Sequence, residues 1–95
     1  MAVSTIPKNL NSLLESNYKV TPIASGTSHV TNITLNAPSG YKFLCVTRAI
    51  TNGWTGTVSA PIISQTSTSE VVDLWFNPAT PNANCSVDVK YLVYN

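Results

Sequence analysis

The sequence predicts an all-β protein, a jelly-roll-like antiparallel β-sandwich preceded by a short N-terminal helical or extended segment. Short stretches in which apolar and polar residues alternate recur at intervals of roughly 10–15 residues, as in sandwiches and closed barrels. Clusters of Gly, Pro, Asn and Ser separate these stretches, and no helical pattern lies between them. No repeat or linker divides the 95 residues, so we assign residues 1–17 to the N-terminal segment and residues 18–95 to one β-sandwich domain.

The N-terminal segment carries a helical pattern of leucines. Leu10, Leu13 and Leu14 are spaced i, i+3, i+4, and Pro7 is acceptable in a first helical turn. The wider pattern is a heptad-like seam with one polar member, which is typical of a helix that associates with copies of itself. Its members are Val3, Ile6, Leu10, Leu13, Asn17 and Val20. A self-associating helix, a helix or turn packed on its own domain, and an extended arm all remain open.

Six strands are predicted after the N-terminal segment. Pro61 lies within the fourth of them. Because proline donates no hydrogen bond to a ladder, we expect that segment to be an edge strand or to contain a bulge. The predicted strands are residues 18–24, 29–36, 41–51, 57–65, 70–76 and 85–94. The sandwich is therefore expected to have about six to eight strands.

The last predicted strand has the clearest alternation. One face is apolar throughout and the other is polar in its first half, so we expect this strand in the middle of a sheet that packs on one side. The apolar face consists of Cys85, Val87, Val89, Tyr91 and Val93. At the end of the opposite face, Leu92 and Tyr94 are too apolar for a water-exposed surface, so we expect them to contact a neighbouring copy of the chain.

In the third predicted strand both alternating sets are apolar. Phe43 belongs to one set, whereas Leu44 and Val46 belong to the other, which indicates burial on both faces. A two-layer domain covers only one face of a sheet, so we expect a second subunit to cover the other. A domain of this size also buries only about 60–65% of its unfolded surface, which makes association favourable. We expect a homotrimer formed through the Leu10/Leu13 segment and an apolar sheet face.

The two cysteines, Cys45 and Cys85, both share a face with apolar neighbours in their predicted strands. Two free, buried thiols are the simpler interpretation, because cysteine packs as a small hydrophobic residue. A Cys45–Cys85 disulfide is the alternative, and it requires the two strands to be neighbours.

Side chains that support catalysis are sparse. His29 is the only histidine, and the acids are Glu15, Glu70, Asp73 and Asp88. Glu70 and Asp73 are three residues apart on a predicted strand and so point to opposite faces. No nucleophile motif of the G-x-S-x-G type accompanies His29. We therefore predict a protein that is not an enzyme, with no cofactor and no metal site.

The charge composition argues against two classes of partner. Only 9% of the residues are charged, whereas Asn, Ser and Thr occupy 33 of 95 positions, and the net charge is +1. The basic residues are scattered rather than clustered, so we predict no nucleic-acid binding. No stretch approaches the ~18 apolar residues that cross a bilayer, and the N-terminus has no basic start followed by an apolar run. We therefore predict neither membrane insertion nor a signal peptide.

The stretch ITNGWTG, residues 50–56, places a tryptophan among residues typical of a turn. Trp54 therefore either folds back over the end of the core or is held outward for a ligand. Trp75 shares its strand parity with Asp73, opposite the more apolar set, so we expect its indole on the outer face of a sheet. Exposed aromatic rings among amides and hydroxyls are typical of sugar binding, which makes Trp54, Trp75 and Asn52 the candidate ligand-binding residues. For each tryptophan a structural contact is nevertheless the preferred interpretation, with Trp54 closing the end of the sandwich and Trp75 in a subunit interface.

Three sequence motifs of the β-domain are considered together. GYKFLCVTRAITNGW opens a strand with Gly40-Tyr41, VDLWFNPAT leads from a strand into Asn77-Pro78, and CSVDVKYLVYN closes the chain with the strand at residues 87–94. This set resembles the C-terminal β-domains of tail-fibre and related appendage proteins of phages and prophages of Gram-positive gut bacteria. The resemblance covers roughly residues 18–95, and its motifs are structural rather than catalytic.

The resemblance implies a trimeric virion structural protein, made in the bacterial cytoplasm, with its β-sandwich at a fibre tip. It further implies an adhesin that binds host-cell glycans, with other virion proteins as partners. Fibre proteins usually carry a long shaft before such a domain, whereas only residues 1–17 precede it here. A capsid or tail decoration protein anchored by its N-terminal segment, and a free carbohydrate-binding module, are therefore the alternatives.

Overall fold

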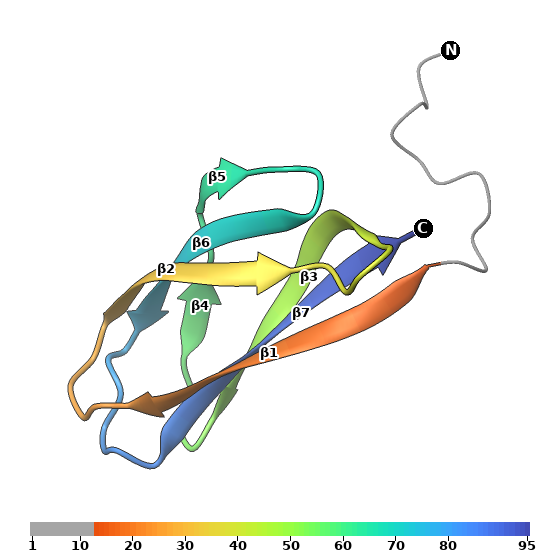
Figure 1. Ribbon diagram of the computed structural model, residues 1–95. Helices are drawn as coiled ribbons and strands as arrows, with labels where there is room; N and C mark the ends of the chain where they lie inside the picture. Colours follow the sequence, from red (N-terminus) through yellow and green to blue (C-terminus); the bar gives the residue numbers. More distant parts are fainter. Residues whose placement is uncertain (1–12) are drawn as a thin grey trace.

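A computed structural model of the protein describes residues 13–95 and shows two antiparallel β-sheets packed face to face (Figure 1). The antiparallel β-sandwich predicted from the sequence is confirmed. The seven strands are β1 (Leu14–Ile23), β2 (His29–Asn36), β3 (Lys42–Asn52), β4 (Thr57–Ser59), β5 (Ile62–Gln65), β6 (Ser69–Asn77) and β7 (Cys85–Tyr94).

The strands are divided between a three-stranded and a four-stranded sheet. Sheet A has the order β1-β7-β3, so β7 is its central strand, as the alternation predicts. Sheet B has β6 at its centre, with β2 on one side and β4 and β5 along the other. The chain passes from one sheet to the other between β1 and β2, between β2 and β3, between β3 and β4, and between β6 and β7.

Two predicted strands differ from the structure in their extent. β1 begins at Leu14, four residues before the predicted start at Tyr18, because its first residues pair with the end of β7. Leu14, Asn17 and Val20 therefore belong to a strand, and the predicted helical seam does not continue through them. The predicted strand around Pro61 is split into β4 and β5, as expected from the proline, and both pieces pair with β6. Residues 1–12, with Leu10, lie outside the described residues.

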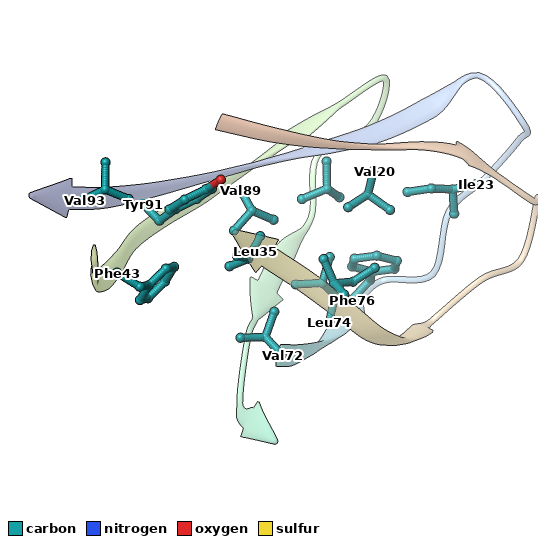
Figure 2. Close-up of a cluster of buried hydrophobic side chains, with 12 residues drawn as sticks. Val20, Ile23, Leu35, Phe43, Val72, Leu74, Phe76, Val89, Tyr91 and Val93 are labelled. Atoms are coloured by element: carbon teal, nitrogen blue, oxygen red, sulfur yellow. The ribbon is translucent and has the colours of Figure 1, made fainter. Parts of the chain in front are cut away.

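The core lies between the two sheets and consists of the inward sets of the alternating strands (Figure 2). Burying one aliphatic side chain of this kind contributes about 1.5–3 kcal/mol relative to exposure. Tyr91 and Phe43 stack with their ring centroids 5.3 Å apart, and the Tyr91 hydroxyl donates a hydrogen bond to the Asn36 carbonyl at 2.8 Å. The side chains with no measurable exposure are Leu35, Val72, Leu74, Val87, Val89 and Val93.

β3 contains two irregularities that explain its double apolar pattern. Its register against β7 shifts between Phe43 and Cys45 and again between Val46 and Arg48. An extra residue in one strand reverses which alternate side chains face inward. Phe43 and Val46, which belong to opposite parities, are consequently opposite the core residues Val93 and Tyr91 of β7. The bulges thus account for apolar residues of both parities in β3.

The same bulges correct the prediction for the cysteines. Both are free; Cys85 is buried, but Cys45 is exposed. Cys45 is opposite Leu92, on the outward side of β7, because the register shift after Phe43 turns it away from the core. Cys85 is at the other end of β7, opposite Ile23 of β1. The structure therefore contains neither two buried thiols nor the alternative disulfide.

Candidate binding face

The outer face of sheet B is formed by polar, mostly uncharged side chains around one tryptophan. β6 alternates strictly, with Glu70, Val72, Leu74 and Phe76 buried and the residues between them turned outward. Directly opposite residues of antiparallel strands share a face, so the register assigns the residues of the neighbouring strands. The outer-face residues are His29, Thr34, Asn36, Thr57, Ser59, Ser64, Val71, Asp73, Trp75 and Asn77.

Trp75 is at the centre of this face, and 48% of its surface is exposed. Its outward position agrees with its place in the predicted strand. The imidazole of His29, directly opposite on β2, stacks on the indole with ring centroids 3.6 Å apart and an interplanar angle of 11°. On the other side of β6, Ser59 of β4 is directly opposite Trp75. His29 thus covers one face of the indole, and the residue paired with Trp75 on the other side of β6 has a small hydroxyl side chain.

Asp73 fixes the position of the histidine. Its Oδ2 lies 3.3 Å from His29 Nε2, which forms an ion pair when the imidazole is protonated. Its Oδ1 accepts a hydrogen bond of 3.0 Å from the backbone N–H of Asn32. Asn32 lies at the β2 register shift and has a φ of 57°, a left-handed conformation that asparagine tolerates better than most residues. The Asp73 carboxylate therefore contacts both the β2 bulge and the His29 imidazole. Through the stacked imidazole it also helps to hold the Trp75 ring in place.

Trp54 lies elsewhere and packs on the core. Its indole meets Phe76 edge-on, with ring centroids 5.6 Å apart and an interplanar angle of 80°, and its Nε1 donates a hydrogen bond to the Pro78 carbonyl at 3.1 Å. Gly53 has a φ of 92°, and a Cβ there would lie 2.7 Å from the Asn84 carbonyl oxygen. The ITNGWTG stretch is thus a turn whose tryptophan folds back over the end of the core. Of the two alternatives for Trp54, the structure thus shows the packing arrangement.

Asn52, the third candidate ligand residue, is on the outer face of sheet A. Its amide donates hydrogen bonds to Ser86 Oγ at 3.2 Å and to Asp88 Oδ2 at 2.9 Å. Asn17 donates a further bond to Asp88 Oδ1 at 3.1 Å. These bonds, first from Asn17 and then from Asn52, lower the pKa of Asp88. The structure therefore separates Trp54, Trp75 and Asn52 into three places and gives only Trp75 an exposed ring.

The predicted oligomer contacts have charged neighbours. Leu92 and Tyr94 are half-buried on the outer face of sheet A, directly opposite Glu15 and Lys42 respectively. Leu13 is half-buried just before β1. The whole outer face of sheet A carries the charged side chains of Glu15, Lys19, Lys42, Arg48, Asp88 and Lys90. The predicted contact residues Leu92 and Tyr94 therefore lie on the outer face of sheet A among charged side chains, and their role in assembly stays a prediction.

Two residues of the Trp75 cluster were missed as candidates from the sequence. Nothing in the sequence singles out His29 or Ser59 as a ligand-binding residue. The only signal that finds them is the register of β2 and β4 on β6, which requires knowing which strands are neighbours. The spacing of Glu70 and Asp73 predicts that they lie on opposite faces of one strand. This is confirmed, because Glu70 is on the buried face of β6 and Asp73 is on its outer face.

Comparisons of the chain with protein-family models, with curated proteins and with solved structures gave no match. The resemblance to phage appendage domains therefore rests on the three quoted motifs alone. Within residues 13–95, no His, Cys, Asp and Glu side chains form a group of three or more suited to a metal ion. The same residues include no helix long and apolar enough to cross a membrane.

Proposed function

We propose that this protein is a non-catalytic binding domain that recognises carbohydrate on the outer face of sheet B, with Trp75 as the stacking platform. The observation that carries the proposal is the 48% exposed indole, which stacks on His29 of β2 and whose register partner on the other side of β6 is Ser59. A planar apolar ring of this kind matches the C–H face of a pyranose, and burying it against a sugar removes apolar surface from water.

The residues around Trp75 supply groups that suit sugar hydroxyls. Ser59 and Thr57 of β4 and Asn77 of β6 are exposed on the same outer face. Hydroxyl and amide groups both donate and accept hydrogen bonds, as sugar hydroxyls do. Because sheet B and the His29–Asp73 contact already fix the indole, little conformational freedom is lost on binding. An uncharged glycan is the ligand class that this combination fits best.

The resemblance of the strand motifs to phage tail-fibre domains supports a biological setting for this activity. We propose an adhesin-type domain at a virion surface, with glycans of the host cell as ligands. A decoration protein of a capsid or tail differs in one respect that can be tested, because its aromatic surface would contact the virion lattice and bind no free glycan.

A glycan array followed by calorimetry on the strongest ligand tests the proposal. Trp75→Ala should weaken binding by at least about 30-fold, which corresponds to the ~2 kcal/mol of a central aromatic contact. Asn52→Ala, on the opposite side of the molecule, is the matched control and should bind as the wild type does. Equal affinities of the wild type and Trp75→Ala, or a wild-type protein that binds no glycan, would contradict the proposal.

A further inference from the structure

The free edge of β1 is a long, regular strand edge. In the part of the chain that the structure describes, β1 pairs only with β7, so its other edge presents N–H and C=O groups with no neighbouring strand. Its register with β7 is unbroken from Leu14 to Val20 and shifts only between Val20 and Ile23, close to Pro22. The regular part of the edge therefore offers seven consecutive residues for pairing.

The side of β1 that faces sheet B is also incompletely covered. Leu14 and Tyr18 share the inward face with Val93 and Val89 of β7, yet they are 44% and 43% exposed. In Figure 1 the N-terminal end of β1 extends beyond the end of β2. An unpaired strand edge is a template for pairing with another strand, and exposed apolar side chains beside it add surface that such a contact would bury.

We propose that β1 pairs with β1 of a second copy of the chain, antiparallel and about a two-fold axis at Asn17. In this register Glu15 of each copy is opposite Lys19 of the other, on the outer face of sheet A. On the inner face, Leu14 is opposite Val20 and Ser16 is opposite Tyr18. The sequence of the strand is thus complementary to itself in charge, which is the property that an isologous contact requires.

The complementarity favours a second copy over another partner. A strand with two like charges at these positions would repel its copy, whereas Glu15 and Lys19 are spaced equally about Asn17 and form two opposite-charge pairs. The contact is two-fold, so it replaces the three-fold assembly expected from the sequence. It also places the exposed parts of Leu14 and Tyr18 next to side chains of the other copy.

The pairing has a geometric consequence for the proposed binding face. A two-fold axis between antiparallel strands of one continuous sheet is perpendicular to that sheet. The two copies of sheet A would form one six-stranded sheet, with both copies of sheet B on the same side. Two Trp75 faces would then point in a common direction, and if the proposed glycan binding is correct, a dimer would bind a glycan-coated surface with avidity. The dimer itself does not depend on that function.

Sedimentation equilibrium of the full chain, with three charge variants, tests the pairing. The wild type should be a dimer at micromolar concentrations. Glu15→Lys and Lys19→Glu should each raise the dimer dissociation constant by about tenfold or more, because symmetry turns two attractive pairs into two repulsive ones. The double variant, Glu15→Lys with Lys19→Glu, should restore the dimer. An equimolar mixture of the two single variants should also associate, since every 15–19 pair is then attractive.

Lys42→Glu is the matched control, because it changes the net charge as Lys19→Glu does but lies on β3, on the far side of β7. It should leave the dimer intact. Lys19 is opposite Asp88, so circular dichroism must show that Lys19→Glu is folded. Glu15 is opposite Leu92, so Glu15→Lys alone tests the pairing if Lys19→Glu is not folded. A wild-type monomer or trimer, or single variants that dimerise as the wild type does, would overturn the proposal.

Discussion

The two outer faces of the sandwich differ in charge, and this difference is the reason for assigning the proposed binding surface to sheet B. The outer face of sheet A carries six charged side chains, and its central carboxylate, Asp88, already accepts hydrogen bonds from Asn17 and Asn52. The outer face of sheet B carries one carboxylate, Asp73, which is committed to His29 and Asn32. Its other polar groups are hydroxyls and amides around an exposed indole.

The contrast shows where a neutral ligand is favoured. Removing water from ionised groups costs far more than removing it from hydroxyls, which exchange a hydrogen bond with water for one with a sugar. The charged face of sheet A therefore keeps its water, or meets a charged partner. Sheet B combines a low desolvation cost with an apolar platform at Trp75. Variants of the two tryptophans, of Glu70 and of Asp88, ordered by the size of their expected effect on stability, test the roles assigned to these positions.

The largest loss of stability is expected from substitution of Trp54. Comparing it with substitution of Trp75 tests whether the two tryptophans have different roles. Trp54→Ala removes the contact with Phe76 and the hydrogen bond to Pro78, so the free energy of unfolding should fall by about 2–4 kcal/mol. Trp75→Ala, whose ring is half-exposed, should cost less than about 1 kcal/mol. Urea denaturation followed by circular dichroism measures both. Equal losses for the two variants would contradict the assignment of Trp54 to packing and Trp75 to binding.

An intermediate effect is expected at Glu70, on the buried face of β6. Burial raises the pKa of Glu70, whose carboxylate accepts a hydrogen bond from Gln65 at 3.1 Å. A pKa that is raised in the folded state favours the protonated form, so wild-type stability should decline as the pH rises from about 4.3 through the folded-state pKa. Glu70→Gln keeps the shape and removes the charge. It should be more stable than the wild type at pH 7 and should lack this decline in a pH series of urea unfolding curves.

Unchanged or reduced stability of Glu70→Gln at pH 7 would show that the buried carboxylate is not a source of destabilisation. Leu35, which is directly opposite Glu70 on β2 and has no measurable exposure, provides the apolar surroundings on which this prediction depends.

The smallest effect is expected at Asp88, on the charged face. Hydrogen bonds from Asn17 and Asn52 lower the pKa of Asp88, so its contribution is present at neutral pH and is lost as the pH falls from about 4 through the folded-state pKa. Asp88→Asn should cost less than about 1 kcal/mol at pH 7, because the group is partly exposed. The wild type and the variant should converge in acid, and glycan affinity should be unchanged. A loss of affinity would place the binding face on sheet A.

The sequence predicted the parts of the fold that depend on local alternation. The inward set of β7 and the outward position of Trp75 follow from period-two patterns that no irregularity interrupts. The exposure of Cys45 did not follow, because two bulges in β3 reverse the parity, and a bulge leaves no distinctive residue in the stretch FLCVTR. The start of β1 at Leu14 was not predicted. The leucine spacing before it is compatible with a helix, but pairing with β7 makes Leu14 the first residue of a strand.

The binding cluster was predictable only in part. Trp75 was recognised as an outward aromatic residue, but its partners come from β2 and β4, which are distant in the sequence. His29 stacks on Trp75 because β2 continues to pair with β6 on the far side of the register shift between Val30 and Ile33. No local pattern encodes that pairing, so the site needed the three-dimensional structure.

The most direct test of the central claim, that binding belongs to the Trp75 face, is a two-dimensional ¹H–¹⁵N NMR titration with the strongest glycan from the array. The chain has two tryptophans, and the indole N–H signal of each reports on one location. We expect the Trp75 indole signal and the backbone signals of Ser59 and Asn77 to shift with ligand, while the Trp54 indole signal stays in place. Shifts confined to Trp54, or to the outer residues of sheet A, would contradict the account.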